Sequence, residues 1–388
     1  MIAVKALHLL SNWRWTGPAE PAVNLCSALR KCGVETSFAC GTEPSDRDNA
    51  IRRRAEELEL PIYHGLRLRK HFSPLSNWFD ARKLATQLRE PIDLIHSHML
   101  SDHGVALSVA RRLKQRALVV RSFYTSDTVH APVRTKRALF AGTDAAIVPC
   151  QAAHDLLVKD FGYPAEKVAL IEVGIDTERF NPDRELADAR QELGISSEDL
   201  VVGIIARIQP HRRYSVLLEA VASVAKEVPN IKLLVLGRGP DKDALVVEPA
   251  HKLGIADTIR FSDYRWDDDY VSAVACMDIE MFLVPGTDGT CRAVREAMAM
   301  GKPVIAARRG ILPELIKDGE TGFVVHDTPE NLANSMKMLL TSKEHRLEMG
   351  RAALAEARRR FSMTAQAENV HKLYQRLLET RVGTEGDK

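Results

Sequence analysis

Short apolar runs alternate with longer amphipathic stretches along most of the chain. The short runs contain few polar positions, which indicates strands buried on both faces, whereas apolar residues three and four apart in the longer stretches indicate helices. In the first half, strands are predicted at 4–10, 35–40, 61–63, 93–97, 117–122, 145–148 and 168–171. Helices are predicted between them at 21–31, 48–58, 80–88, 104–113, 134–141 and 151–161. This alternation predicts a parallel, doubly wound α/β sheet covered on both faces.

The segment 181–199 interrupts this pattern, because it is polar, rich in charge and contains Asn-Pro-Asp. We interpret it as a linker between a domain at 1–180 and a second domain at 200–364. The second domain is predicted to have strands at 200–205, 231–236, 258–261, 278–284, 303–306 and 322–325, and helices at 216–228, 241–253, 292–300, 329–341 and 344–361. A last helix at about 365–380 and a disordered tail at 382–388 are expected to follow.

The composition fits a globular protein of two domains, with 388 residues, 45% hydrophobic and 27% charged. No window approaches the ~18 apolar residues that span a bilayer. The N-terminus lacks the basic region and cleavage site of a signal peptide and is interpreted as a strand. The six cysteines show no C-x-x-C spacing, which favours reduced thiols over zinc or disulfides; Cys291 alone is expected to be partly accessible. These features predict a cytoplasmic protein.

The net charge of +2 is unevenly distributed. Residues 1–180 hold 25 basic and 20 acidic side chains, a net charge of +5, whereas the remainder holds 29 and 32, a net charge of −3. This asymmetry is too mild to predict nucleic-acid binding, but it favours an anionic partner for the first half. There, the segment 66–79 mixes bases with bulky apolar residues. It is expected either to contact an anionic membrane surface or to begin a helix with a solvated face.

The strongest candidate chemistry lies in the stretch 285–305. An apolar run ends at Pro285, a turn rich in Gly and Thr follows, and a helix is predicted from Arg292. A strand, a Gly-rich turn and a helix in this order present backbone N–H groups that stabilise an anion. Asp288 and Glu296, eight positions apart, are suited to accept hydrogen bonds from hydroxyls. The stretch therefore predicts a ligand with phosphate in its middle and sugars at both ends.

This stretch resembles the E-x7-E segment of the retaining GT-B glycosyltransferases of family 4, also called glycosyl transferases group 1. The resemblance implies that Asp288, at the first Glu, contacts the transferred sugar and that Glu296, at the second, binds the ribose of the nucleotide. It further implies that sugar and diphosphate are held by the turn formed by Gly289, Thr290, Cys291 and Arg292. Asp288 is one methylene shorter than the family's Glu, which leaves the donor sugar and the level of activity open.

Further segments resemble the family. The segment 204–213 resembles G-R-L-x-x-x-K-G, which implies that Arg207 and Arg212 neutralise the diphosphate and stabilise it as a leaving group. Arg213 stands where the family has Gly. A G-x-G-P near the nucleotide base is matched by Gly237 and Gly239, and Gly17 matches the Gly-rich loop after the first strand; a plain turn is the equal alternative for that loop.

In the first domain, His98 follows a predicted strand at the edge where open parallel sheets bind ligands. The resemblance implies that His98 hydrogen-bonds the donor sugar, and Tyr124 stands where many relatives have His. The alternatives are a loop histidine without a role and a metal site of His96, His98 and His103. The acids at 267–269 are interpreted as the first turn of a helix rather than a metal site. The family generally needs no metal.

The resemblance implies a GT-B architecture, with two Rossmann-like domains facing each other across a cleft and the final helix packed on the first domain. It also implies a metal-independent hexosyltransferase that moves a sugar from a nucleoside-diphosphate sugar to an acceptor hydroxyl. The acceptor is expected to be a cell-envelope lipid or saccharide, and no cofactor beyond the donor substrate is expected. A nucleotide-sugar-binding protein with little transferase activity and a sugar-nucleotide epimerase are the alternatives.

Overall fold

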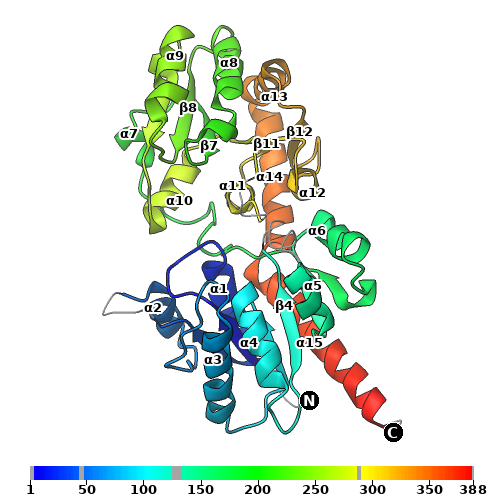
Figure 1. Ribbon diagram of the computed structural model, residues 1–388. Coiled ribbons are helices and arrows are strands. Elements are labelled where there is room, and N and C mark those ends of the chain that lie inside the picture. Colours follow the sequence, from blue (N-terminus) through cyan, green and yellow to red (C-terminus); the bar gives the residue numbers. More distant parts are fainter. Residues whose placement is uncertain (1–3, 43–47, 125–132, 286–289, 387–388) are drawn as a thin grey trace. The chain divides into compact units, whose positions relative to one another are not determined.

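The computed structural model describes residues 4–42, 48–124, 133–285 and 290–386, with side chains through 381 and except those of 133–135, and the chain divides into two compact units (Figure 1). The first unit contains the described residues up to Gly174, Thr290 and the C-terminal segment from Ser362. The second contains the other described residues between Ile175 and Phe361. Each unit is built around its own six-stranded sheet, and every strand pairs in parallel with its neighbours.

The first sheet has the strand order β2-β1-β3-β4-β5-β6. Its strands are β1 (Lys5–Leu10), β2 (Glu35–Cys40), β3 (Leu94–Ser97), β4 (Leu118–Ser122), β5 (Ala145–Val148) and β6 (Val168–Leu170). The helices between them are α1 (Ala19–Lys31), α2 (Ala50–Glu57), α3 (Pro74–Gln87), α4 (Leu100–Ala110), α5 (Val133–Phe140) and α6 (Gln151–Asp155), which continues as a π-helical turn to Asp160. The alternation of strands and helices predicted from the sequence is confirmed.

Successive side chains of β1 point to opposite faces of this sheet, and each face has its own helices. Ala6 belongs to a core formed with α1 and with the C-terminal helix α15 (Met363–Gly386), which contributes Tyr374. Leu7 belongs to a second core formed with α3 and α4. The last helix, red in Figure 1, thus returns to pack against α1 of the first unit.

The second sheet has the strand order β12-β11-β10-β7-β8-β9. Its strands are β7 (Leu200–Ile205), β8 (Ile231–Leu236), β9 (Ile259–Ser262), β10 (Ile279–Phe282), β11 (Val304–Ala307) and β12 (Gly322–Val325). Its α-helices are α7 (Ala189–Glu192), α8 (Tyr214–Ala225), α9 (Glu248–Lys252), α10 (Asp267–Ala275), α11 (Arg292–Ala299), α12 (Leu312–Leu315), α13 (Pro329–Thr341) and α14 (Lys343–Arg360). Apolar side chains of β7, β8 and β10 form one continuous core with α8 and α13.

The segment interpreted as a linker is part of the second unit. It contains α7, and the guanidinium of Arg190 donates to the carbonyl of Cys276 at 3.0 Å. Arg265 forms an ion pair with Glu192 at 2.7 Å. Ala189, Leu193 and Ile195 of this segment are buried as well. Polar composition misled the sequence interpretation because these few apolar residues stand among many charged ones.

The strand predicted at 61–63 is wrong, because Ile62 forms only an isolated bridge with Phe38. Two backbone hydrogen bonds join these segments, from Phe38 to Pro61 and from Tyr63 to Phe38. Pro61 has no N–H to extend the ladder. Helix α3 also begins earlier than predicted, at Pro74, a residue that the first turn of a helix accommodates well.

Candidate active site

Each sheet has one point at which the strand order reverses. In the first sheet β1 lies between β2 and β3, and in the second β7 lies between β8 and β10. At such points the connections leave towards opposite faces, so open parallel sheets bind ligands at the carboxyl ends of these strands. The residues predicted to be functional follow these strands: Gly17 comes after β1, His98 after β3, Arg207 after β7, and the turn into α11 after β10.

In the second unit, three arginines after β7 have different surroundings. Arg207 is exposed, and no hydrogen bond or ion pair to another described residue engages it. Arg212 donates to the carbonyl of Val284 at 2.7 Å, which ties its guanidinium to the chain just after β10. Arg213 has the left-handed φ of +60° that suits the family's Gly, and it pairs with Asp327. Arg207 and Arg212 therefore lie where strand ends meet, while Arg213 is used for a contact within the protein.

The two glycines after β8 let the loop after β8 cross close to the loop after β7. A Cβ on Gly237 would lie 2.1 Å from the carbonyl oxygen of Ala206, and one on Gly239 would lie 1.9 Å from that of Ile208. The loops are joined by hydrogen bonds from Ala206 to Leu236 at 3.2 Å and from Ile208 to Arg238 at 3.1 Å. Loop packing thus explains glycine at both positions. Their contribution to donor binding stays a prediction.

Gly239→Ala is expected to lower the free energy of unfolding by ~1–3 kcal/mol, because the added methyl must displace the Ile208 backbone. The displacement should also weaken donor binding, since Arg207 precedes Ile208. Urea denaturation and donor titration measure the two effects. Gly17→Ala is the stability control, because a Cβ there would meet no atom within 4 Å, and its change should stay within ~0.5 kcal/mol. If both variants lost the same stability, the close crossing of the two loops would not explain the effect of Gly239→Ala.

Glu296 is a buried carboxylate held by two side chains. It lies in α11 and is 3% exposed. The hydroxyl of Tyr270 in α10 donates to its Oε2 at 2.7 Å, and Nε of Arg292 lies 3.2 Å from its Oε1. Tyr270 itself packs edge-on against Phe180 at 5.9 Å between ring centroids. Burial, followed by the Glu296 charge, raises the pKa of Tyr270 well above its usual value, so Tyr270 remains a hydrogen-bond donor.

A second carboxyl, Glu280, is fully buried on β10. Its Oε1 accepts a long hydrogen bond from the Ile205 N–H at 3.4 Å, and no described residue hydrogen-bonds its Oε2. Burial is the main cause that raises the pKa of Glu280 well above its usual value, and the charge of Glu296 adds to it. Burial therefore favours the neutral acid at Glu280, whereas Glu296 has the donors that stabilise an anion.

The turn before α11 is described only in part. Asp288 and Gly289, predicted to hold sugar and diphosphate, lie outside the described residues, whereas Thr290 is described and buried. Cys291 is the N-cap of α11 with a left-handed φ of +44°. Its side chain is 2% exposed, so the expectation of an accessible thiol is wrong. A cysteine thiol behaves as a small apolar group, and here the turn directs it inward.

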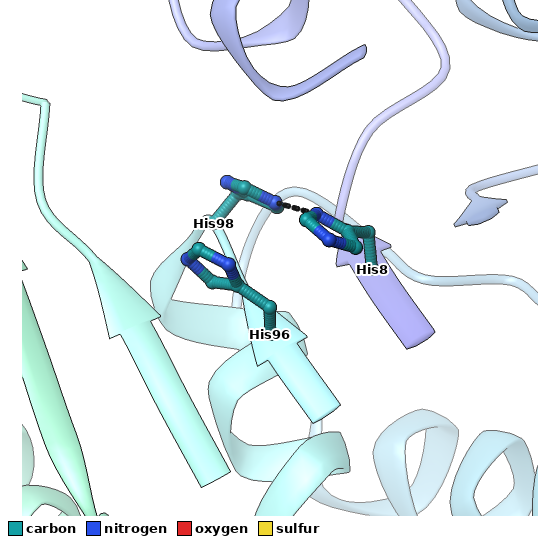
Figure 2. A group of neighbouring side chains, drawn as sticks. All are labelled: His8, His96 and His98. Carbon is teal, nitrogen blue, oxygen red and sulfur yellow. Dashed lines mark hydrogen bonds between the residues drawn. The ribbon is translucent and has the colours of Figure 1, made fainter. Parts of the chain in front are cut away.

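In the first unit, buried polar side chains form a hydrogen-bonded network at the carboxyl ends of β1, β3 and β4. His98 is 2% exposed; its Nδ1 lies 2.6 Å from the Tyr124 hydroxyl and its Nε2 lies 3.0 Å from Nδ1 of His8 (Figure 2). His96 bonds Ser122 at 2.8 Å and Tyr374 of α15 at 2.6 Å. Hydrogen bonds thus join Tyr124, His98 and His8 in one chain and Tyr374, His96 and Ser122 in another. The two chains meet where the His96 and His98 rings stack, 4.5 Å apart between centroids.

The network keeps its histidines neutral. Burial lowers the pKa of His8 to about 3, and burial together with the neighbouring rings lowers the pKa of His96 and His98 well below the usual value. Both ring nitrogens of His98 are engaged, so its ring can hydrogen-bond a sugar only after releasing Tyr124 or His8. The role of His98 in sugar binding stays a prediction with that requirement.

The structure brings together a different set of histidines from the one that the sequence suggested for a metal site. His8 joins His96 and His98, with possible ligand atoms within 4.8 Å of one another, whereas His103 bonds Thr143 at 2.8 Å. A divalent ion would have to displace the His8–His98 hydrogen bond of Figure 2 and the hydrogen bonds of His96 to the Ser122 and Tyr374 hydroxyls. It would also add charge to a buried site that already lies near the Arg121 guanidinium. The geometry is that of a hydrogen-bonded network.

Two residues that sequence reasoning missed hold these strand ends together. Asp102 in α4 accepts from the backbone N–H of Ser11 at 2.6 Å and of Met99 at 2.9 Å, so it joins the ends of β1 and β3. Burial raises its pKa to about 7 against the opposing effect of these donors. Arg121 is buried on β4 and donates to the Met99 carbonyl at 3.0 Å. An aspartate five residues after a strand end, at the third position of the next helix, is the only sequence signal for this arrangement, and it is weak.

The chain is similar to known proteins over nearly its whole length. Residues 187–356 match the family described as Glycosyl transferases group 1, and residues 17–179 match Glycosyltransferase Family 4. A D-inositol 3-phosphate glycosyltransferase of Corynebacterium glutamicum (strain R) is 30% identical over 381 residues, which covers 91% of this chain and 90% of that protein.

Solved structures share the fold at lower identity. Anabaena Alr3699/HepE in complex with UDP and glucose is 20% identical, with a TM-score of 0.75 over 96% of this chain and 99% of that one. A glycosyltransferase from Rickettsia africae ESF-5 is 15% identical, with a TM-score of 0.81 over 97% of this chain and 99% of that one.

Proposed function

The chain belongs to the group 1 glycosyltransferases of family 4, which have the GT-B fold and bind nucleotide sugars, and on this premise we propose that it transfers a hexosyl group from a nucleoside-diphosphate sugar to an acceptor hydroxyl with retention of configuration. One observation carries the proposal. At the carboxyl edge of the second sheet, the cationic side chains of Arg207 and Arg212 follow one strand of the reversal point, and the carboxylate of Glu296, held by Tyr270, follows the other.

These groups suit the parts of a nucleotide sugar. Guanidinium groups neutralise a diphosphate and stabilise the charge that develops on it when it leaves. Glu296 accepts hydrogen bonds from the ribose hydroxyls while Tyr270 keeps the carboxylate in place. The transferred sugar is assigned to Asp288, and the diphosphate also to the turn from Gly289 to Arg292.

The reaction needs few protein groups in this proposal. The bond between the anomeric carbon and the diphosphate oxygen breaks, and the acceptor oxygen bonds to the same face of that carbon. The acceptor proton passes to the leaving diphosphate oxygen, so no separate general base is required. The acceptor is assigned to the first unit, near Gly17 and His98. The name of the corynebacterial relative makes D-inositol 3-phosphate the first acceptor to assay, beside cell-envelope lipids and saccharides.

Donor binding is tested by thermal unfolding with UDP-, GDP- and ADP-sugars, beginning with UDP-glucose because a neighbour in fold was solved with UDP and glucose. A donor present at 100-fold over its dissociation constant should add ~2.7 kcal/mol to the stability of the protein. Arg207→Ala should weaken binding by ~10²-fold or more through the lost charged contact, which reduces the same stabilisation to ~0.4 kcal/mol.

The neighbouring variant Arg213→Ala is the control, because Arg213 pairs with Asp327 and is not assigned to the donor. It should retain the full donor-induced shift even if its own stability changes. Equal loss in both variants, or no shift with any donor, would contradict the assigned donor site. A donor that binds without transfer to any acceptor, or that is converted without one, would favour the binding protein or the epimerase.

A further inference from the structure

A basic and apolar ridge lies on the first unit, formed by the exposed side chains of residues 67–82. Four large apolar side chains on it are exposed, Phe72 by 46%, Leu75 by 75%, Trp78 by 44% and Phe79 by 57%. Within residues 67–82 the sequence has four Lys or Arg residues and one acid, Asp80. A surface that combines bulky apolar groups with a single sign of charge is atypical of one that faces only water.

Helix α3 separates its buried and exposed faces clearly. The buried residues of this helix are Ser76, Asn77, Asp80, Ala81 and Leu84. Leu75, Trp78, Phe79 and Arg82 recur at the spacing of one helical face, and all four are exposed. The Trp78 and Phe79 rings contact edge to face at 5.0 Å between centroids, and the Arg82 guanidinium lies 5.8 Å from the Trp78 ring. The exposed face is thus apolar with a basic border.

The basic loop before α3 is fixed to that helix. Both oxygens of Asp80 accept backbone N–H bonds, from Arg67 at 2.8 Å and from Leu68 at 2.9 Å. The single acid of the ridge is therefore buried and used internally, and it does not offset the surrounding positive charge. The loop presents Arg69 and Lys70, both exposed, just before the apolar face.

The ridge adjoins the end of the first sheet to which the acceptor is assigned. Asn77 of α3 donates to the carbonyl of Ser101 at 3.1 Å, and Ser101 lies in the first turn of α4, which begins two residues after His98. Nowhere in the described part of the chain does a helix have the length and apolar character needed to cross a bilayer. A membrane contact made by this chain would therefore have to be peripheral.

We propose that this ridge docks the protein on an anionic lipid bilayer, with Leu75, Trp78 and Phe79 entering the interface and the surrounding bases contacting lipid phosphates. Aromatic rings favour the headgroup region, and positive charge favours anionic leaflets. Neither signal suffices alone, and the ridge combines both. The proposal does not depend on the donor site, but it would bring the acceptor side of the first unit to lipid-linked hydroxyls.

Vesicle flotation with the full chain tests the proposal, with phosphatidylcholine vesicles compared with an equimolar mixture of phosphatidylcholine and phosphatidylglycerol. The protein should bind the mixture and bind phosphatidylcholine weakly, and added salt should weaken binding. Arg69→Gln with Lys70→Gln should lower the partition coefficient by ~30-fold. Leu75→Ser with Phe79→Ser should lower it by ~10-fold or more.

Matched controls are exposed residues of the second unit, Met338→Ser with Leu347→Ser for the apolar pair and Lys343→Gln with Arg351→Gln for the bases. These should bind vesicles like the wild type. Circular dichroism and the donor-induced thermal shift confirm that the ridge variants are folded. A lost donor shift with intact vesicle binding would contradict the donor site and leave this proposal standing.

Three outcomes would overturn the proposal. One is vesicle binding whose strength does not depend on lipid charge, on salt or on the ridge substitutions. A second is competition by free glycerol 3-phosphate, which would indicate a headgroup pocket rather than a surface. The third is a self-associated protein that becomes monomeric in the Leu75→Ser/Phe79→Ser variant and binds no vesicles, which would make the ridge a protein–protein interface.

Discussion

Replacing Glu296 by glutamine is expected to lower kcat/KM for sugar transfer by about 10²–10⁴-fold. A hydrogen bond to a charged group contributes ~1.5–3 kcal/mol, and a carboxylate that accepts two ribose hydroxyls makes two of them. Glutamine has the same shape, and Tyr270 can still donate to its amide oxygen, so the fold around α11 should be retained. Steady-state kinetics with the donor identified by thermal shift measure the loss.

Glu280→Gln is the matched control for this substitution. Glu280 is also buried and lies on the neighbouring strand β10, but burial and the Glu296 charge raise its pKa well above the usual value, which favours the neutral acid. Glutamine has the shape of this carboxyl without its charge, and Glu280 is not assigned to the donor, so the variant should keep kcat/KM within a few-fold of the wild type. If Glu296→Gln had wild-type kinetics, the proposed contact between Glu296 and the ribose would be wrong. If both variants lost the same activity, the loss would be due to altered packing rather than to a lost ribose contact.

Acidification from pH 6.5 to 5 is expected to lower the free energy of unfolding by roughly 2–3 kcal/mol per pH unit. Burial lowers the pKa of His8 to about 3 and that of His96, His98 and His103 well below the usual value. In the unfolded chain they titrate near pH 6.5, so below that pH the unfolded state binds more protons. Each histidine then removes ~1.36 kcal/mol per pH unit, stability that is fully present only above pH ~6.5.

Two buried carboxyls oppose this trend. The pKa of Asp102 is raised to about 7 and that of Glu280 well above its usual value, in both cases mainly by burial. Their folded forms bind protons at a pH where the unfolded forms remain ionised, so acidification stabilises the folded state through them. They offset about two of the four histidines, which leaves the net fall stated above. Against a total stability of ~5–15 kcal/mol this is a large effect.

Urea denaturation at a series of pH values measures the slope, and His103→Gln isolates one contribution. His103 is buried and bonds Thr143 at 2.8 Å through Nε2, a contact that the glutamine amide can replace. The variant should lose ~1 kcal/mol per pH unit of the acid dependence. The exposed His64→Gln should leave the slope unchanged. A stability independent of pH between 6.5 and 5 would contradict the buried, neutral histidines.

The strands were predicted more accurately than the residues that hold the site. The predictions for 35–40, 145–148, 200–205, 231–236 and 322–325 agree with β2, β5, β7, β8 and β12 to the residue. Strands buried on both faces are continuous apolar runs, and their ends are marked by glycines and charges. The strand expected at 61–63 failed because its existence depends on a ladder with β2, which the local sequence does not report.

In the Arg-rich loop after β7, the family resemblance predicted the position of the arginines but not their contacts. The resemblance placed Arg207 and Arg212 in the segment that follows a strand, which is where the structure has them, and it identified Arg213 as a departure. It did not predict that Arg213 would keep the left-handed backbone of a glycine while pairing with Asp327, a residue more than a hundred positions away. Likewise, Gly237 and Gly239 were matched by motif, but their crossing with the loop after β7 became visible only in three dimensions.

By itself, the sequence determined the order of strands and helices and the loops in which the glycines, arginines and acids stand, because periodicity and turn chemistry act over a few neighbouring residues. Only the tertiary structure decided that Tyr270 holds Glu296, that His8 engages His98 and that Tyr374 reaches His96. These pairs are 26, 90 and 278 positions apart. Such contacts depend on which strand lies beside which and where a distant helix packs, and a single sequence carries no local mark of either.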